Sequence, residues 1–172
     1  IKPGDEIYFV SDTFSTIPTM RILGHEEKEA RKVVIVGGGN IGLYVAEELE
    51  KENDVNVKVI EINKERAEII AEKLPKSIVI NGSALEEEIL EEANVENAEA
   101  VISVSNDDEV NILSSLLSKT LGAQTSFTLL NNHSFVPLMG NLGIDVTVNP
   151  RETTVSSILQ HVRRGKIRFA HT

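Results

Sequence analysis

The segment Lys32-Val-Val-Ile-Val-Gly-Gly-Gly-Asn-Ile-Gly42 joins a short apolar run to a helix-forming stretch through closely spaced glycines. The run Val33 to Val36 predicts a buried strand, and the residues after Gly42 predict a helix. Gly37, Gly39 and Gly42 have the G-x-G-x-x-G spacing, which is meaningful when it lies between a strand and a helix. The segment therefore predicts the first strand, turn and helix of a dinucleotide-binding α/β fold.

These glycines also predict a ligand. Gly37 allows the tight turn, Gly39 lets a pyrophosphate approach the backbone, and Gly42 lets the helix lie close to the strand. The backbone N–H groups of residues 39–42 would face the phosphates at the positive end of the helix dipole. A nucleotide-binding pocket is the first functional hypothesis.

Composition limits the other functions that this chain could have. Its 172 residues, 41% hydrophobic and 26% charged, are typical of one globular domain, with or without attached pieces. The chain has no cysteine, which excludes disulfides, thiol nucleophiles and cysteine-based metal sites and fits a cytoplasmic protein. The net charge of −10 argues against nucleic acid and anionic lipid as partners.

The chain after the glycines alternates strand and helix patterns with short breaks. The expected strands are 33–36, 55–62, 77–81, 100–104, 125–130 and 144–148, and the expected helices are 41–51, 64–74, 85–93, 108–121 and 135–142. This alternation implies right-handed crossovers between parallel strands. We expect a Rossmann-like, doubly wound α/β fold with a six-stranded parallel sheet.

Both ends of the chain carry segments that such a fold does not need. Residues 1–11 predict an isolated strand that must pair elsewhere, and residues 12–30 predict a linker. A helix over residues 151–164 is expected to end at Gly165. One side of it carries an apolar stripe, formed by Val155, Ile158, Leu159 and Val162. The stripe either packs on this domain or reaches another subunit or domain, and the chain, which begins with Ile1, is expected to be a fragment.

An acidic residue at the end of the second strand is the next candidate for ligand binding. Glu61 follows the glycines by about 20 residues, the distance at which an acid binds the ribose diol of a dinucleotide. Its carboxylate would repel a 2′-phosphate and so favour NAD or an adenosine nucleotide over NADP. A surface glutamate in an acid-rich chain is the alternative. Arg66 complicates the choice, because an arginine can accept a 2′-phosphate or stack on adenine.

Small polar residues follow the third and fourth strands, where ligands bind in open α/β sheets. Gly82 and Ser83 could face adenine or the second ribose. Ser105, Asn106 and Asp107 could close over the phosphates. Asn106 or Asp107 is also suited to capping the helix that follows.

A catalytic set is missing from the sequence. A dehydrogenase needs an acid or base near the nicotinamide, and Tyr44 and the four histidines show neither suitable spacing nor an orienting carboxylate. His133, in the loop after the fifth strand, is the one plausible general base. We expect a site that binds a nucleotide without reacting with it.

At this point the sequence resembles a known family, the regulator-of-potassium-conductance (RCK) or TrkA N-terminal domains. The resemblance covers roughly residues 30–165. Besides the glycine segment, it rests on Val59-Ile-Glu-Ile-Asn63, Ile80-Asn-Gly-Ser-Ala84, Ser105-Asn-Asp-Asp-Glu-Val-Asn-Ile112 and Asn141-Leu-Gly-Ile-Asp-Val-Thr-Val-Asn-Pro150. One departure is Glu61, where the family commonly has aspartate.

The resemblance implies a ligand and the residues that bind it. The ligand would be NAD or NADH, with ATP or ADP as the other possibility. The implied site comprises Gly37, Gly39, Asn40, Ile41 and Gly42 at the phosphates, Glu61 at the ribose with Ile62 and Arg66 beside it, Gly82, Ser83 and Ala84 near adenine, and Ser105, Asn106 and Asp107 near the far end.

The resemblance also implies an organisation and a role. Residues 1–30 would end a preceding small β-rich subdomain, residues 31–150 would bind the nucleotide, and residues 151–172 would form a crossover helix and begin a further subdomain. Such units form a ring at the inner face of the cell membrane. There they regulate an integral-membrane potassium transporter subunit of the TrkH or TrkG type. The competing hypotheses are an NAD-dependent oxidoreductase whose catalytic domain lies outside this chain, and a redox-sensing transcription regulator, which the acidic charge disfavours.

Overall fold

The computed structural model describes the backbone of residues 30–168 and the side chains as far as residue 162. Residues 1–29, which hold the expected strand and nearly all of the expected linker (12–30), lie outside the described residues, as do residues 169–172 at the end of the segment (151–172) expected to begin a further subdomain.

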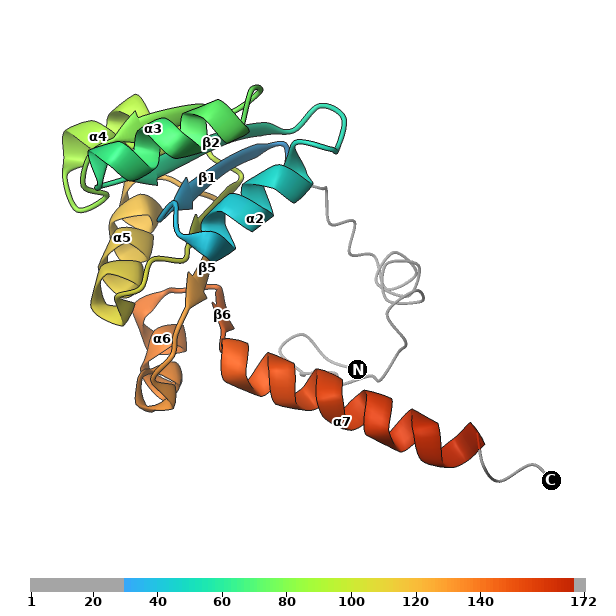
Figure 1. The fold of residues 1–172 in the computed structure, drawn as a ribbon. Coiled ribbons are helices and arrows are strands. Elements are labelled where there is room, and N and C mark those ends of the chain that lie inside the picture. The colour runs from blue at the N-terminus through green and yellow to red at the C-terminus, as the bar shows by residue number, and fades with distance from the viewer. Residues whose placement is uncertain (1–29, 169–172) are drawn as a thin grey trace.

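A six-stranded parallel sheet forms the centre of the domain (Figure 1). Its strands are β1 (Lys32–Val36), β2 (Asn56–Glu61), β3 (Ile78–Asn81), β4 (Ala100–Ser103), β5 (Thr125–Leu129) and β6 (Val146–Val148). Their order is β3-β2-β1-β4-β5-β6, and every pairing is parallel. The predicted Rossmann-like fold is therefore confirmed, with β6 shorter than expected.

Helices cover both faces of this sheet. They are α2 (Asn40–Leu49), α3 (Lys64–Lys73), α4 (Glu87–Glu92), α5 (Asp108–Leu121), α6 (Val136–Leu142) and α7 (Pro150–Arg168), with short 3-10 turns η1 (Val95–Asn97) and η2 (His133–Phe135). Successive residues of a strand point to opposite faces. Val33 and Ile35 of β1 therefore pack with α2 and α3, whereas Val34 and Val36 pack with α4 and η1.

The inner face of α5 is polar. Asn111, Ser114 and Ser115 are fully buried against the sheet. Ser115 donates its hydroxyl to Ser103 at 2.9 Å and shares a 2.7 Å hydrogen bond with Thr128. Buried hydroxyls cost free energy unless they are paired, so this network ties α5 to β4 and β5 in one register.

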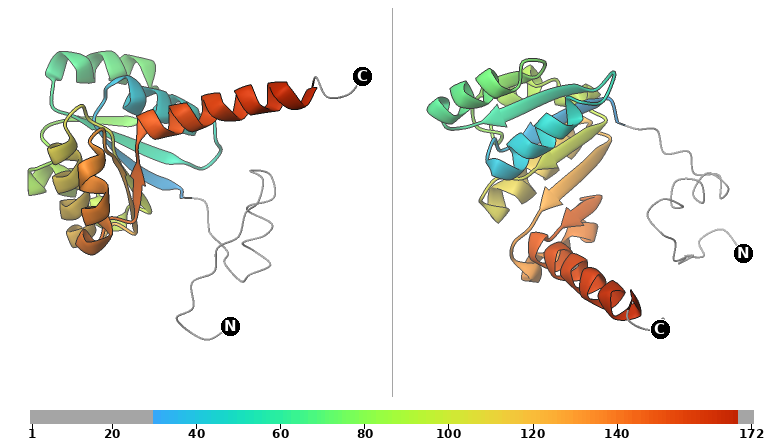
Figure 2. Two further views of the ribbon diagram at one scale, coloured as in Figure 1. Left: turned by 90° about the horizontal axis from the view of Figure 1, so that it is seen from below. Right: turned by 45° about the vertical axis from the view of Figure 1, so that its right-hand side comes forward.

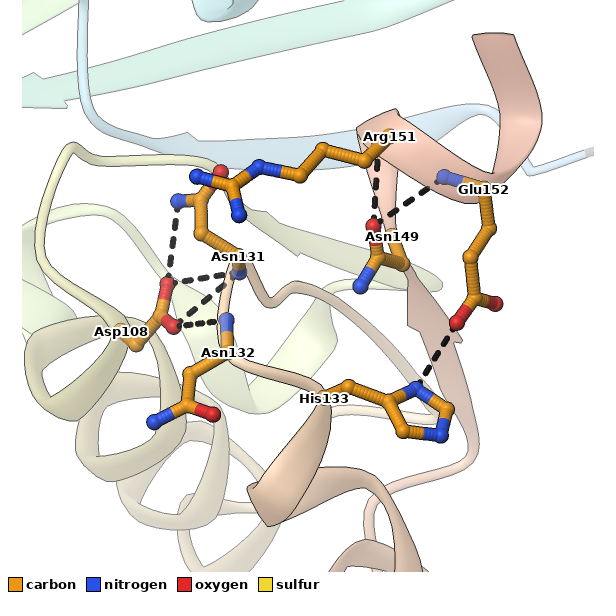
Figure 3. Close-up of a pocket in the computed structure, with 7 residues that line it drawn as sticks. All are labelled: Asp108, Asn131, Asn132, His133, Asn149, Arg151 and Glu152. Atoms are coloured by element: carbon orange, nitrogen blue, oxygen red, sulfur yellow. Dashed lines mark hydrogen bonds and ion pairs between the residues drawn. The ribbon is translucent and has the colours of Figure 1, made fainter. Parts of the chain in front are cut away.

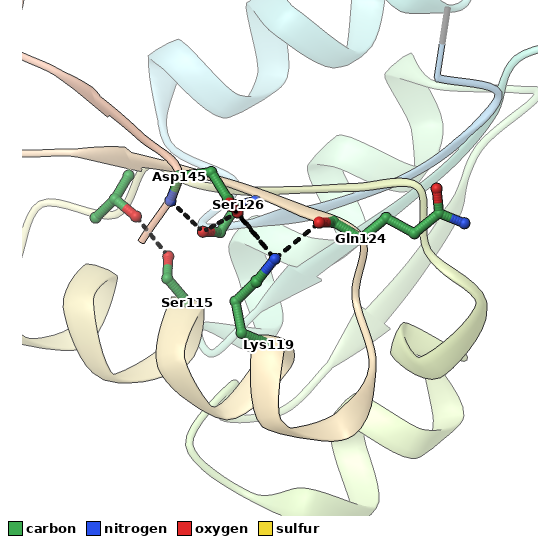
Figure 4. A network of polar contacts seen from close by, with 6 residues as sticks. Ser115, Lys119, Gln124, Ser126 and Asp145 are labelled. Carbon is green, nitrogen blue, oxygen red and sulfur yellow. Dashed lines mark hydrogen bonds and ion pairs between the residues drawn. The ribbon is translucent and has the colours of Figure 1, made fainter. Parts of the chain in front are cut away.

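A second polar network ties β6 to β5 and α5 (Figure 4). The carboxylate of Asp145, just before β6, accepts from the backbone N–H of Ser126 at 2.7 Å and from its hydroxyl at 3.0 Å. Lys119 of α5 lies 3.0 Å from the same carboxylate and donates to the carbonyl of Gln124 at 2.7 Å. The last strand is thus held by charged hydrogen bonds as well as by strand pairing.

The final helix, α7, leaves the end of β6 and projects away from the α/β body in every view (Figures 1 and 2). Its apolar stripe stays exposed: Val155, Ile158, Leu159 and Val162 are 55%, 57%, 46% and 58% accessible. Of the two expected alternatives, packing on this domain is therefore wrong. The expected end at Gly165 is also wrong, because the helix continues to Arg168. A glycine inside a helix costs only about 1 kcal/mol relative to alanine, which is too little to stop it.

Within residues 30–168, no helix has the length and apolar character needed to cross a membrane.

Candidate functional site

Of the three glycines that form the G-x-G-x-x-G pattern between β1 and α2, two are crowded and one is open. Gly37 has φ +99°, and a Cβ on it would lie 2.8 Å from the backbone of Ser105. A Cβ on Gly42 would lie 1.9 Å from the carbonyl oxygen of Gly37. A Cβ on Gly39 would meet nothing within 4 Å. Gly37 and Gly42 are thus needed for packing, whereas Gly39 borders open space that a ligand could enter.

Gly38 is a further crowded glycine that the sequence pattern missed. Its Cβ would lie 2.1 Å from Cδ1 of Ile70 on α3 and 3.0 Å from Oε2 of Glu61. The G-x-G-x-x-G pattern leaves this position free, and the close approach of α3 depends on the tertiary fold. The glycine at 38 therefore lets α3 and the end of β2 reach the loop.

The N-terminus of α2 is left without a side-chain cap. Its N-cap residue is Gly39, and its first turn, which includes Asn40 and Ile41, carries no acid. Among residues 30–168, no backbone acceptor outside the helix receives the N–H groups of residues 39–42. By contrast, Asn63 caps α3 and Asp107 caps α5 through side-chain oxygens. The uncapped N–H groups and the helix dipole make this terminus suitable for an anion.

Glu61 and Arg66 both contact the glycine loop. The carboxylate of Glu61 accepts from the N–H of Gly38 at 2.7 Å and from the N–H of Asn63 at 2.8 Å. Nε of Arg66 donates to the carbonyl of Gly38 at 2.8 Å. Each carboxylate oxygen keeps a lone pair for a ribose hydroxyl. Nη2 of Arg66 is buried without a hydrogen-bond partner in the described residues.

The residues after β2 and β3 lie next to one another but differ in access. Ile62 is 73% exposed, whereas the Ala84 methyl is buried in the core. Gly82 donates its N–H to the carbonyl of Glu61 at 3.1 Å, and the hydroxyl of Ser83 accepts from Leu85 at 3.3 Å. Of the residues expected near adenine, the side chain of Ala84 is therefore structural. Ile62 and the turn at residues 82–83 border the strand ends.

The loop after β4 combines helix capping with a fixed backbone. The carboxylate of Asp107 accepts from the N–H of Val110 at 3.0 Å, as expected for an N-cap, and this hydrogen bond holds the pKa of Asp107 below its ordinary value. The Ser105 hydroxyl donates to the carbonyl of Asp107 at 3.1 Å. Asn106 is exposed. Of the three expected ligand contacts in this loop, Asn106 is the one whose side chain has no internal role.

A cleft of about 440 Å³ lies farther along the same edge, at the carboxyl ends of β5 and β6 (Figure 3). It is lined by Asp108, Asn131, Asn132, His133, Asn149, Arg151 and Glu152. The buried Asp108 carboxylate accepts from the backbone N–H groups of Asn131 at 3.0 Å and Asn132 at 2.8 Å. Asp108 therefore fixes the loop that follows β5.

The opposite side of the cleft contains the one histidine that the sequence singled out. Nδ1 of His133 lies 2.8 Å from Oε1 of Glu152, so the expectation that no carboxylate orients a histidine is wrong here. Glu152 lies on α7, and this contact depends on where that helix begins. Both side chains are largely exposed, at 71% and 62%. The pair links η2 to α7 at the protein surface.

Taken together, the strand ends offer backbone N–H donors at α2, a carboxylate at β2 and an amide-rich cleft at β5 and β6. This arrangement suits an extended anionic ligand lying across the edge. No cluster of metal-ligating side chains occurs in the part of the chain that the structure describes.

Comparison with known proteins identifies relatives of the whole arrangement. Residues 33–150 match the TrkA-N domain family. The chain is 51% identical over 173 residues to the Trk system potassium uptake protein TrkA of Azorhizobium caulinodans, an alignment that covers 100% of the chain and 38% of that protein. The chain therefore spans little more than a third of that relative.

Solved structures share the fold at low identity. The TrkA-N domain of the Escherichia coli inner membrane protein YbaL superposes with a TM-score of 0.68 at 18% identity, over 78% of this chain and 98% of that one. The GsuK channel bound to NAD superposes with a TM-score of 0.60 at 18% identity, over 78% of this chain and 25% of that one.

Proposed function

Because the chain belongs to the TrkA-N domain family, we propose that it is part of a nucleotide-binding regulatory subunit of a Trk-type potassium uptake system. The observation that carries this proposal is the open space over Gly39 beside the uncapped N-terminus of α2. Residues 31–150 would form the nucleotide-binding unit, with residues 1–30 and 151–172 belonging to the segments on either side.

The proposed ligand is NAD or NADH, with ATP or ADP as the other candidates. Its phosphates would lie against Gly39, Asn40 and Ile41, and its adenosine ribose against Glu61. The carboxylate of Glu61 disfavours a 2′-phosphate, and Arg66 lies at the same end, where its Nε donates to the carbonyl of Gly38.

The order of the strands indicates how far a mononucleotide (ATP or ADP) and a dinucleotide (NAD or NADH) would each extend along the edge of the sheet. Neighbouring strands lie about 4.8 Å apart, so β5 is about 10 Å from β1. A mononucleotide anchored at Glu61 would end near the loop at Ser105. A dinucleotide would continue to the cleft beyond it, where the side-chain amides of Asn132 and Asn149 line the wall. NAD or NADH therefore makes fuller use of this edge than ATP or ADP does.

The proposed role is regulation rather than catalysis. Units would assemble into a ring on the cytoplasmic side of the membrane, next to an integral-membrane potassium transporter subunit, and the exposed stripe on α7 would contact a neighbouring unit. A nucleotide can shift such a ring only by binding one shape more tightly than another. A tenfold preference is worth only about 1.4 kcal/mol, so several sites acting together are needed for strong gating.

Calorimetric titration of NAD, NADH, ATP, ADP and NADP into the full chain tests the ligand assignment. We expect NAD, NADH, ATP and ADP each to bind more tightly than NADP. Glu61→Ala should weaken binding by about tenfold, since it removes charge-assisted hydrogen bonds to the ribose. Glu68→Ala is the matched control, because Glu68 is exposed on the neighbouring helix α3.

Unchanged affinity in Glu61→Ala would rule out the ribose assignment. A hydride-transfer assay on the longer protein, with NADH and candidate carbonyl substrates, addresses the oxidoreductase alternative. Turnover that disappears in His133→Ala would favour that alternative over the regulatory role.

A further inference from the structure

The side chain of Asn111, on α5, directs its hydrogen bonds at the loop around Ser105 and at the end of β5 rather than at its own helix. Its side chain is fully buried. The amide oxygen accepts from the N–H of Ser105 at 2.7 Å, and Nδ2 donates to the carbonyls of Ser105 at 3.1 Å and Leu129 at 3.0 Å. The side chain thus pairs with both backbone groups of Ser105, as a neighbouring strand would.

This pairing occurs just where the backbone of β4 has left the sheet. Ser103 is the last residue of β4, and the N–H of Val104 still bonds to the carbonyl of Val36 at 2.8 Å. On its other side, Ser105 touches Gly37 so closely that a Cβ there would lie 2.8 Å from its N and Cα atoms. Ser105 is therefore held between the glycine turn and Asn111.

Core packing alone does not account for an amide at this position. A buried amide is tolerated when its polar atoms are paired, and an apolar side chain of similar size would fill the same space. Such a side chain would leave the N–H and carbonyl of Ser105 unpaired. The neighbouring Ser115, by contrast, bonds to side chains of the sheet and reaches no loop. Asn111 and Ser115 are therefore both buried, but Asn111 fixes the backbone of a loop whereas Ser115 joins the helix to the sheet.

We propose that Asn111 is a positioning residue of the nucleotide site. It fixes the loop at Ser105 against the glycine turn and so sets the position of the next residue, Asn106, which is expected to reach the phosphates over Gly39. This inference rests on the proposed nucleotide-binding function and deepens it, because it names what sets the shape of the phosphate end.

The test compares Asn111→Ala with Ser115→Ala in the full chain, using ADP and NADH as the probes in calorimetry. Both substitutions remove buried hydrogen bonds and should lower the melting temperature. Asn111→Ala should also weaken binding of both nucleotides at least tenfold, whereas Ser115→Ala should stay within twofold of the unsubstituted chain. The reference for hydrogen exchange is the unsubstituted chain without nucleotide. Compared with it, the backbone amide of Ser105 should exchange faster in Asn111→Ala and slower when ADP is bound to the unsubstituted chain.

The outcomes separate this inference from the function on which it rests. If the unsubstituted chain binds neither ADP nor NADH, the proposed function fails and the inference with it. If it binds them and the two variants bind equally well, Asn111 is structural only. Should Asn111→Ala fail to fold, Asn111→Ser takes its place. An exchange rate at Ser105 that ADP leaves unchanged would then overturn the proposal.

Discussion

Gly39 differs from the other glycines of its loop in having open space where a side chain would stand. Its φ of −61° and ψ of −169° are accessible to alanine. We expect Gly39→Ala to lower the free energy of unfolding by about 1 kcal/mol at most, because glycine is preferred to alanine at an N-cap but no packing contact is disturbed. Binding of ADP and NADH should nevertheless weaken at least tenfold, because the new methyl group occupies the path of the phosphates. Chemical denaturation and calorimetry measure the two effects separately.

Gly42→Ala is the matched control, since its methyl group would meet the carbonyl of Gly37 at 1.9 Å. It should destabilise the chain by about 1–3 kcal/mol, as overpacked positions do. If Gly39→Ala bound both nucleotides normally, the phosphates would have to lie elsewhere on the edge.

At the scale of elements, the start of β6 depends on a carboxylate whose ionisation can be tested. Burial raises the pKa of Asp145, but the N–H and hydroxyl of Ser126 and the Lys119 ammonium outweigh it, so the pKa is lower than usual. A lowered folded-state pKa contributes stability that is present above the unfolded value of 3.8 and is lost as pH falls through the folded value.

Asp145→Asn should therefore destabilise the chain at pH 7 by about 1 kcal/mol, the usual net value of such hydrogen bonds. The difference from the unsubstituted chain should shrink below about pH 4, as the native carboxylate is protonated. Urea denaturation between pH 3 and pH 7 measures it. Glu72→Gln on α3 is the control for loss of an exposed carboxylate, and an equal pH dependence in both variants would exclude the network as the cause.

We expect the exposed stripe on α7 to be needed for assembly. Val155→Asp combined with Leu159→Asp places two charges on a surface that would be buried against a neighbour, and it should shift sedimentation toward smaller species. Ser156→Asp combined with Gln160→Asp adds the same charge to other faces of the helix and should leave the assembly intact. Persistence of the oligomer in the first variant would show that α7 is not the contact surface.

The sequence pattern predicted the existence of this helix but not where it ends or what its stripe contacts. The i, i+3, i+4, i+7 spacing of the stripe predicted a helix correctly, because this spacing follows from the helical repeat itself and does not depend on what the helix contacts. Gly165 was expected to terminate it, yet a glycine is a weak stop when no tertiary contact favours a turn. Exposure of the stripe could not be read from the sequence, because an amphipathic pattern does not identify its partner.

Across the whole molecule, the sequence predicted the local structure better than it predicted the long-range contacts. The six-stranded parallel sheet follows from alternating strands and helices with right-handed crossovers, and it was predicted correctly. The hydrogen bond between Gly38 and Glu61, and those of Asn111 with Ser105 and Leu129, join residues that only the folded chain brings together. Asn111 carried no signal of its own, since a polar residue on a helix is usually read as exposed.

The proposed signalling role makes a last prediction, which follows from linkage between binding and assembly. If a nucleotide changes the assembly equilibrium by some factor, assembly must change nucleotide affinity by the same factor. The variant carrying Val155→Asp and Leu159→Asp should therefore bind NADH with an affinity that differs from that of the assembled chain. Coupling of about 1–3 kcal/mol corresponds to a difference of about 5- to 150-fold. Titration of NADH into both forms, alongside sedimentation with and without NADH, gives the two factors independently. Equal affinity in both forms would mean that the nucleotide does not sense the neighbouring units, and a ring that reports nucleotide occupancy through α7 would then be untenable.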